Sequence, residues 1–575
     1  MILKALCDYY DRHKDDLPAF GLEQKEIAFL IVIDNDGHFV RFEDRRIDAK
    51  HAQEFLVKKH VGRTSGAKAN FLYDNSEYVL GFTNKEGKGN VCFEVFSKLV
   101  HDTLEQAPDN AALNAIAKFY DQGQAAIIAA AQADPLWETI EKNLDKKFST
   151  FSFLIEGDST IVAAKPEILR LAADSQNGKL KRCLITGDYA PTVDVTTATM
   201  IPGSQATAKL VSFQLNSGYD SYGKKQGQNA PISAEAEFRY STALNAMLAK
   251  DSRHKFLFGN RTFVFWVSTT GDVGEKAEEG IFSLFGFKDN DLDAAATIDQ
   301  VRKVFMSIYS GQMRTTLEDR FFILGLAPNS ARIAVSYWAE IPLREFAALI
   351  LRHFDDMEII DTRKEKKPYF GIHSLMAATT PTWKASDASP NLAEQLVKSI
   401  FQGLPYPHAL YMGALNRVRA GQSAINIVHA AIMKAYLNRL PNINNNKQLH
   451  IMLDKENTNQ GYLCGRLFAV LDKIQYDANG ISTIRERYMN SACATPAAVF
   501  ATILNLSNHH AEKLSKGAQI YYEKMKQEIV SAIDATGFPA HLDLQDQGRF
   551  FVGYYHQRQE IFKSNDKTVV VTENE

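Results

Sequence analysis

The chain has 575 residues, which is too long for one hydrophobic core and predicts several domains. Hydrophobic residues make up 45% and charged residues 23%, a composition typical of folded proteins and not of disordered ones. No uncharged apolar run approaches the roughly 18 residues of a membrane span, and the first residues, MILKALCDYYDRHKDD, carry acids where a signal peptide stays apolar. We therefore expect a cytoplasmic protein without a membrane partner.

The formal net charge of -3 provides no global attraction to nucleic acid, so any such binding depends on local patches. The cysteines are scattered without a CxxC pair, so their spacing predicts neither a zinc ribbon nor a disulfide framework. We expect most of them to be buried thiols and expect no metal or cofactor. They are Cys7, Cys92, Cys183, Cys464 and Cys493.

The first region, to about residue 125, begins with a helix whose apolar face holds Leu3, Leu6 and Tyr10. Two strands follow, at residues 27–34 and 39–44, and the Asp36-Gly37 pair between them predicts a hairpin.

A glycine-containing basic loop follows these strands, in VKKHVGRTSGAKANFLYDNSEYVLG (residues 57–81). Cations next to glycines can wrap a backbone phosphate, and an asparagine can read a base edge. An ordinary solvated basic loop is the alternative.

The middle of the chain alternates helices and strands. Residues 111–146 are alanine-rich and helical, strands return at Phe151, and residues 261–268 (RTFVFWVS) predict a buried strand. Residues 321–326 and 331–338 predict a hairpin-like pair with turn chemistry at Pro328 and Asn329.

The central stretch, residues 210–250, predicts a strand at 210–215, a polar loop, and a helix capped by Ser233. The loop mixes glycine, lysine, tyrosine and amide side chains, which suits contact with a polar anionic polymer. An ordinary surface loop is the alternative. GYDSYGK has the spacing of a phosphate-binding loop, but Lys225 replaces its Ser/Thr, and the helix begins only after Pro231.

The last third predicts helices only. Residues 391–402, 407–420 and 424–440 precede the asparagine-rich linker PNINNNK (441–447), and a helical bundle follows. The bundle helices are expected at residues 461–476, 495–515, 518–535 and 544–559. Cations of the bundle either line one face or are ordinary surface charges; they are Arg466, Arg485, Arg487, Lys513, Lys516 and Lys524.

These patterns predict an α+β fold: a mixed N-terminal region with antiparallel sheets and helices, then an all-α bundle. We expect three regions, a mixed region for DNA recognition, a helical connector and a bundle similar to a small subunit, at residues 1–370, 371–448 and 449–575.

The run SYGKKQGQNAPIS (221–233) and the YSTALN of the next helix resemble the large-subunit family of type I-C CRISPR Cascade surveillance complexes. The resemblance covers nearly the whole chain through further ordered motifs. They are MILKALCDYYDR, RTSGAKANFLYDNSEYVLG, LGLAPNSARIAVSYW, GLPYPHALYMGALNRVR, LDKENTNQGYLCGRLFAVLDKIQ and FPAHLDLQDQGRFFVGYYHQR.

The resemblance implies a non-catalytic, DNA- and RNA-binding subunit at the crRNA 5′ end, beside the backbone subunits and the 5′-end subunit. Such a subunit recognises the protospacer-adjacent motif on double-stranded target DNA, helps R-loop formation and recruits the helicase-nuclease. The resemblance also implies a separately translated small subunit along the displaced non-target strand, and Met452 is placed for its internal start.

The candidate DNA-binding residues lie in the two polar loops. Lys68 and Lys224 are expected to hold phosphates, and four amides to contact base edges or wedge the strands. The full set is Arg63, Thr64, Ser65, Lys68, Asn70, Asn75, Tyr222, Lys224, Gln226 and Asn229.

Two other functional classes remain open. GYDSYGK and the dipeptide His101-Asp102 motivate a nucleotide- or metal-dependent nucleic-acid enzyme, although no known catalytic constellation is present. A scaffold subunit whose loops touch only protein is the third possibility.

Overall fold

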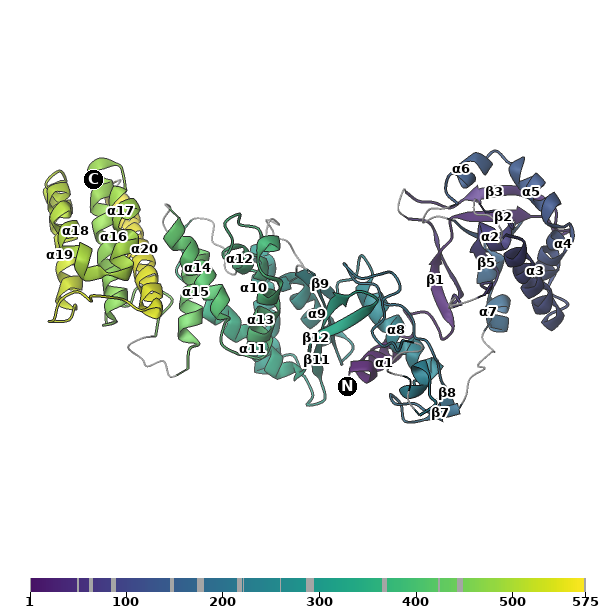
Figure 1. Ribbon diagram of the computed structural model, residues 1–575. Coiled ribbons are helices and arrows are strands. Elements are labelled where there is room, and N and C mark those ends of the chain that lie inside the picture. The colour runs from purple at the N-terminus through teal and green to yellow at the C-terminus, as the bar shows by residue number, and fades with distance from the viewer. Residues whose placement is uncertain are drawn as a thin grey trace. The chain divides into compact units, whose positions relative to one another are not determined.

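The computed structural model (Figure 1) confirms an α+β fold with a helical C-terminal part. It describes residues 2–48, 51–61, 66–83, 89–144, 149–172, 180–214, 220, 222–258, 260–285, 294–363, 370–421, 425–441 and 448–572.

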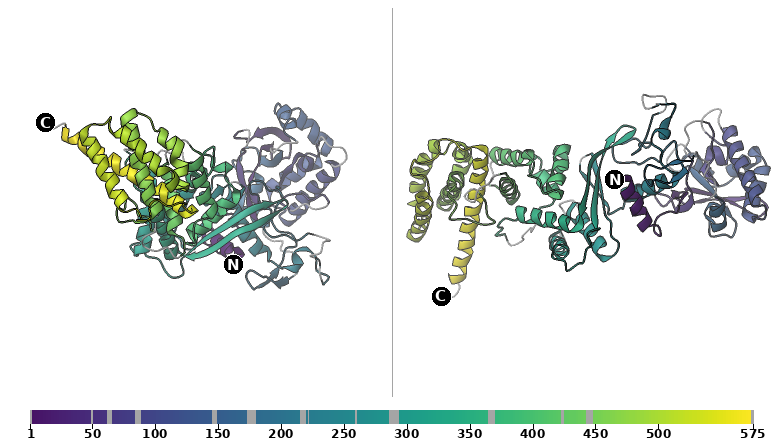
Figure 2. Two further views of the ribbon diagram at one scale, coloured as in Figure 1. Left: turned by 60° about the vertical axis from the view of Figure 1, so that its left-hand side comes forward. Right: turned by 90° about the horizontal axis from the view of Figure 1, so that it is seen from below.

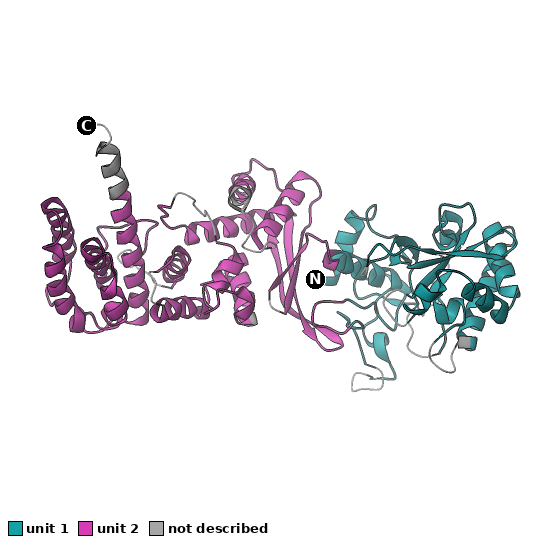
Figure 3. Cartoon of the chain, turned by 90° about the horizontal axis from the view of Figure 1, so that it is seen from above, with its two compact units in different colours: residues 1–199, 206–246 teal, residues 200–205, 247–575 magenta. Residues whose placement is uncertain are grey.

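The chain forms two compact units (Figure 3). Unit 1 comprises residues 1–199 and 206–246, and unit 2 comprises residues 200–205 and 247–575. This division falls inside the expected mixed region of residues 1–370. Helices of the expected connector and of the expected bundle lie together in unit 2, where they share one hydrophobic core.

Unit 1 is built on a four-stranded sheet with the order β3-β2-β6-β5. All five residues of β2 (Phe29–Ile33) are buried, because β2 pairs on both sides, antiparallel with β3 (Phe39–Asp44) and parallel with β6 (Thr150–Ile155). The short β5 (Tyr73–Asn75) completes the sheet. The hairpin expected at Asp36-Gly37 is confirmed. Gly37 has a φ of 82°, and a Cβ there would lie 2.6 Å from the Phe119 nitrogen, so glycine is required.

Helices bury the sheet of unit 1 through aromatic contacts. The ring of Phe153 in β6 lies 5.6 Å from Phe119 and 6.0 Å from Tyr120, centre to centre. The helices are α2 (Ser76–Val79), α3 (Gly89–Gln106), α4 (Ala111–Asp121), α5 (Gln124–Gln132), α6 (Trp137–Glu141) and α7 (Pro166–Ala172).

The remaining elements of unit 1 carry the polar loops. The predicted first helix, α1 (Ile2–Arg12), packs on α8 (Ala234–Leu248), where the Cys7 thiol donates to the Ala236 carbonyl over 3.5 Å. Unit 1 also contains two antiparallel pairs of strands. They are β1 (Leu22–Glu26) with β4 (Glu54–Lys58), and β7 (Leu180–Arg182) with β8 (Tyr189–Pro191).

The strand expected at residues 210–215 is wrong for its described part, because residues 210–214 form no strand. Apolar and polar residues do alternate there, but the segment is held by a side chain, since the Thr196 hydroxyl donates to the Val211 carbonyl. Alternation alone does not supply a neighbouring strand.

The sheet of unit 2 has the order β12-β11-β10-β9 and is antiparallel throughout. Its strands are β9 (Lys255–Phe258), β10 (Arg261–Val267), β11 (Arg320–Asn329) and β12 (Arg332–Pro342). The buried strand and the hairpin are confirmed, but the turn lies two residues later than expected. Asn329 pairs with Arg332, so Ser330, with a φ of 55°, and Ala331 form the turn.

The helices of unit 2 pack on one side of this sheet and on one another. α16 and α20 run side by side (Figure 2), and a Cβ at Gly465 would lie 1.9 Å from the Phe550 carbonyl oxygen. The helices are α9 (Asp272–Phe285), α10 (Ala294–Ser310), α11 (Leu343–Met357), α12 (Ile372–Ala377), α13 (Pro390–Phe401), α14 (His408–Ala420), α15 (Ile427–Asn438), α16 (Gln460–Asn479), α17 (Thr483–Ala494), α18 (Pro496–Ala511), α19 (Lys516–Ser531) and α20 (Leu544–Thr572). The expected bundle is therefore confirmed, with α17 as an additional member.

Candidate nucleic-acid interface

Two cations at the end of β4 face the protein. Lys58 lies 5.0 Å from the centre of the Phe71 ring, and burial lowers the pKa of its amine. The Lys59 amine donates to the Thr197 hydroxyl over 2.6 Å and lies 3.5 Å from a carboxylate oxygen of Glu237 on α8. These lysines therefore stabilise unit 1, whereas Lys68, among the described residues of the first loop, is an exposed cation.

The first loop is closed by a side chain. The Asn70 amide oxygen accepts the Val61 N–H over 2.9 Å, and the Asn70 N–H donates to the buried Asp74 carboxylate over 2.8 Å. Arg63, Thr64 and Ser65 lie outside the described residues. Because Asn70 joins the two ends of the loop, its amide oxygen has a structural role that the sequence pattern did not reveal.

Asn75 has a structural role as well. It is the N-cap of α2, with extended backbone dihedrals, and its amide oxygen accepts the Tyr78 N–H over 3.3 Å. Asparagine is a preferred N-cap residue. The Asn-Ser-Glu sequence before a short apolar run could therefore have predicted this capping role from the sequence.

The central loop is clamped to the chain that follows β8. The Gly227 N–H donates to the Asp194 carbonyl over 3.1 Å, and a Cβ at Gly227 would lie 2.4 Å from the Val193 carbonyl oxygen. The Val193 N–H in turn donates to the Ile232 carbonyl over 3.0 Å. Gly227 therefore allows a backbone approach that no larger residue permits.

The clamped loop presents an aromatic ring and an amine to solvent. Tyr222 is 97% exposed and has a φ of 51°, and Lys224 is also exposed. The Asn229 side-chain amide donates to the carbonyls of Lys224 and Gln226, over 3.2 and 3.3 Å, so it holds the loop in this conformation. Gln226 itself has a φ of 46° and is partly buried.

A thiol that the sequence did not single out holds the other end of this loop. The Cys183 sulfur accepts the N–H groups of Ser233 and Ile185, over 3.3 and 3.4 Å. Burial by itself raises the pKa of this thiol, but the hydrogen bonds from Ser233, Thr186 and Ile185 lower the pKa to about 7. The Ser233 hydroxyl also caps α8 as predicted, since it accepts the Ala236 N–H over 3.2 Å.

The supports of the two loops meet at one carboxylate. Glu237, 5% exposed, accepts the Thr197 N–H over 2.6 Å through one oxygen and faces Lys59 with the other. Burial lowers the pKa of the nearby Lys209 amine, although Glu237 opposes that shift. The segment after β4, the segment after β8 and α8 are thereby joined in unit 1.

A family model described as CRISPR-associated protein (Cas_Csd1) matches residues 6–562. The chain belongs to this family. The membership expected from the motifs is confirmed, and it makes the chain a large subunit of a CRISPR Cascade complex, a structural component of that assembly. A search of curated proteins found no match to the chain. No helix in the described ranges is long and apolar enough to cross a membrane.

The His101-Asp102 dipeptide of this Cascade large subunit lies on α3. Nδ1 of His101 lies 2.8 Å from the Ser97 carbonyl oxygen and Nε2 lies 3.1 Å from an Asp121 carboxylate oxygen. The Ser97 hydrogen bond raises the pKa of His101, and Asp121 raises it further, so the ring pairs α3 with α4. Among the described residues, no three His, Cys, Asp or Glu side chains are grouped as metal ligands.

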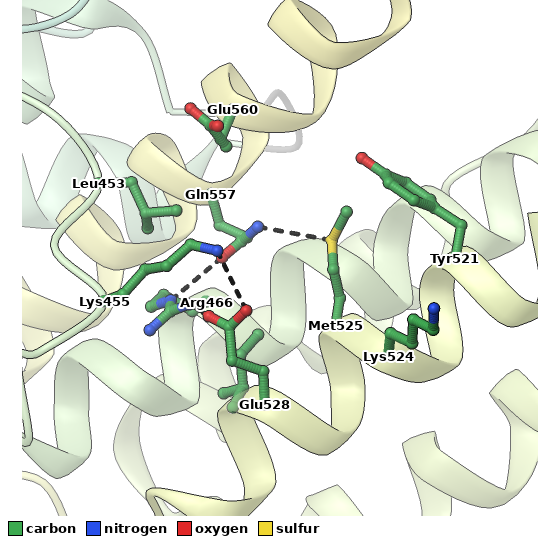
Figure 4. A pocket seen from close by; sticks show the side chains of 10 residues that line it. Leu453, Lys455, Arg466, Tyr521, Lys524, Met525, Glu528, Gln557 and Glu560 are labelled. Atoms are coloured by element: carbon green, nitrogen blue, oxygen red, sulfur yellow. Dashed lines mark hydrogen bonds and ion pairs between the residues drawn. The ribbon is translucent and has the colours of Figure 1, made fainter.

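The bundle cations do not share one exposed face. Figure 4 shows Arg466, 2% exposed, in the wall of a pocket of about 270 Å³. Its guanidinium donates to Glu528 over 2.8 Å and to Gln557 over 3.1 Å, while Lys455 also lies 3.1 Å from Glu528. Arg466 therefore joins α16, α19 and α20 and is not an ordinary surface charge.

Proposed function

We propose that the two polar loops of unit 1 form the surface with which this Cascade large subunit recognises the protospacer-adjacent motif on double-stranded DNA. The observation that carries the proposal is the central loop, which is clamped at Gly227 and presents Tyr222 and Lys224 to solvent. The described part of the loop from 222 to 229 is held in one conformation, so it loses little entropy on binding and its contacts contribute more fully to affinity.

Each side chain of the loops has a role that matches its chemistry. Lys224 and Lys68 hold phosphates, because an exposed ammonium is a compact cation. Tyr222 provides a ring that stacks on a base or enters between two base pairs and so helps R-loop formation. Gln226 contacts base edges. Asn70, Asn75 and Asn229 act on the DNA through the loop conformations that they hold.

In this proposal the subunit is not catalytic. It belongs to a type I-C complex, contacts the crRNA, the backbone subunits and the crRNA 5′-end subunit, and recruits the helicase-nuclease. The guide reads the target by base pairing, so the protein needs to read only a short motif.

We also propose that α16–α20 are made separately as a small subunit from Met452, which is 54% exposed and precedes α16. In the full chain, α20 packs on α14, where the Tyr411 hydroxyl donates to the Leu544 carbonyl and a Cβ at Gly548 would lie 2.3 Å from that hydroxyl. A fragment that begins at Met452 exposes this face of α20 to a partner. Loss of a short product on a blot after Met452→Leu supports the start, and an unchanged blot contradicts it.

The test of the DNA interface is binding of the guide-loaded complex to target duplexes with and without the adjacent motif, at one fixed salt concentration. Tyr222→Ala and Lys224→Ala are compared with Lys98→Ala, which removes an exposed lysine of α3. Removal of a stacking ring or a phosphate contact is expected to weaken binding about tenfold. Preserved assembly with unchanged DNA affinity in both loop variants contradicts the proposal and favours a scaffold whose loops contact protein.

A further inference from the structure

A second pocket of the bundle lies between α16, α17 and α20 and has a volume of about 260 Å³. This is slightly below the usual range of small-molecule sites, about 300–1,000 Å³, and suits a single planar group. Its wall combines two aromatic rings, three cations and one carboxylate: Tyr476, Phe562, Lys473, Arg485, Arg558 and Asp472.

The aromatic rings are both accessible and supported by cations. Tyr476 is 53% exposed and Phe562 is 38% exposed. The Lys473 amine lies 5.4 Å from the centre of the Tyr476 ring and 5.9 Å from that of Phe562, and the Arg558 guanidinium lies 5.4 Å from the Phe562 ring. In proteins that bind single-stranded nucleic acids, exposed aromatic rings stack on the bases and neighbouring cations neutralise the phosphates.

Two residues that line the pocket, Asp472 and Arg485, also carry buried polar atoms without a partner among the described residues. Asp472 is 6% exposed; its Oδ2 accepts the Tyr554 hydroxyl over 2.7 Å and lies 3.6 Å from Arg485 Nη1. Within the described chain, Oδ1 of Asp472 and Nε of Arg485 are buried and have no hydrogen-bond partner. A buried acceptor and a buried donor left in this state cost free energy, which a ligand would recover by supplying both complements once a small shift of the pocket wall uncovers the two atoms.

Guanine supplies those complements side by side. Its N1–H and N2–H₂ donors suit a carboxylate, and its O6 and N7 acceptors suit an arginine. O6 and N1 are on neighbouring ring positions, as Asp472 and Arg485 are neighbours in the pocket. Adenine would place the N1 lone pair against the carboxylate, and a pyrimidine offers a smaller surface for stacking. We propose that this pocket binds an unstacked guanine base, from a single strand or from a free nucleotide.

The first test uses the full-length protein alone and a labelled oligothymidine that carries one central dG, dA or deoxyinosine. The dG oligonucleotide is expected to bind about tenfold more tightly than the dA oligonucleotide, because a good bidentate contact discriminates by that order. Deoxyinosine lacks the N2 amino group and is expected to lose part of this preference. Equal affinities for dG and dA overturn the proposal.

Variants locate the site. Asp472→Asn keeps an acceptor for Tyr554 but loses the charge, and it should abolish the preference for dG. Phe562→Leu should weaken binding of the dG and dA oligonucleotides alike. Glu560→Gln, in the other pocket of the bundle, removes a carboxylate charge as well and should change neither (Figure 4). A preference for dG retained in Asp472→Asn overturns the proposal; if that variant does not fold, an unchanged Phe562→Leu overturns it.

Two further measurements distinguish a free nucleotide from a base within a single strand. In the first, the protein is titrated with GMP and with AMP. If a free nucleotide is the ligand, GMP binds, and it binds more tightly than AMP. A preference for dG in the oligonucleotide without GMP binding assigns the ligand to a single strand. The inference does not depend on the unit 1 loops, so the dG preference should survive in Tyr222→Ala; its loss there contradicts the assigned site.

Discussion

The two units place their ionisable side chains differently. In unit 1, histidines pair with carboxylates at partly exposed positions, as in His60–Glu23 at 2.8 Å and His101–Asp121 at 3.1 Å. Unit 2 instead buries several such side chains among its helices: His353, Lys434, Arg439, Arg466 and His556. Surface pairs contribute little to stability, whereas a buried charge is costly to leave without its partner. Several buried ionisable side chains therefore determine the fold of unit 2, while the loops of unit 1 depend on backbone clamps and on the two buried carboxylates of Asp74 and Glu237.

Removal of a buried guanidinium is expected to have the largest effect. Arg439, the C-cap residue of α15, donates to Asp356 over 2.6 Å and to the carbonyls of Ser399 and Leu404, each over 2.8 Å. Arg439→Met leaves the carboxylate without this partner, so it should destabilise unit 2 by about 3–5 kcal/mol. Urea unfolding measures this change.

The matched control for Arg439→Met is Lys142→Met in unit 1. Lys142 pairs with Glu138 one helical turn away, and the two side chains are 67% and 79% exposed. Its loss should change the free energy of unfolding little, because fully exposed ion pairs contribute little to stability. Similar losses of stability in the two variants would contradict the contrast between the units.

Acid should destabilise unit 2 through two buried histidines. Burial lowers the pKa of His353 to about 3, with a contribution from Arg439, and lowers the pKa of His556 to about 3, with a contribution from Lys434. The unfolded chain binds these protons at a pKa of about 6.5. Stability is therefore complete above pH 6.5 and is lost as the pH falls toward 3, by about 2 kcal/mol for each histidine at pH 5.

Unfolding curves at pH 7 and pH 5 measure this loss. His353→Gln should reduce the pH dependence, although it also removes the 2.7 Å contact of the ring with the Tyr406 hydroxyl. The pKa of His101 in unit 1 is raised instead, so its contribution is present at low pH and is lost as the pH rises through that pKa. An equal pH dependence in wild type and His353→Gln would contradict the role of His353.

The smallest effect on global stability is expected for the central loop of unit 1. Gly227→Ala places a methyl group 2.4 Å from the Val193 carbonyl oxygen, which must displace the loop from its clamp. Asn229→Ala removes two hydrogen bonds to loop carbonyls at a partly exposed site, so it should loosen the loop locally. Both variants should accelerate tryptic cleavage after Lys224 and Lys225 several-fold with little change in melting temperature. An unchanged cleavage rate would show that the clamp does not hold the loop.

Local patterns predicted much of this fold. The Asp36-Gly37 hairpin, the Ser233 cap and the bundle helices follow from turn chemistry, a capping hydroxyl and helical periodicity, all of which act between residues close in sequence. The family motifs also lie in the sequence itself, and they identified the large-subunit family. The candidate loops were found in the same way, from glycine, lysine and amide residues in short stretches.

Contacts between distant segments decided the rest. The described part of the strand predicted at residues 210–215 has no strand partner among the described residues, and the Thr196 hydroxyl holds this segment instead. The sequence pattern treated the cations of residues 57–81 and Arg466 as loop and surface charges, yet Glu237 pairs with the partly buried Lys59 and Glu528 with the buried Arg466. A short pattern cannot specify these outcomes, because the free energy of burying a charge depends on which carboxylate the rest of the chain places beside it.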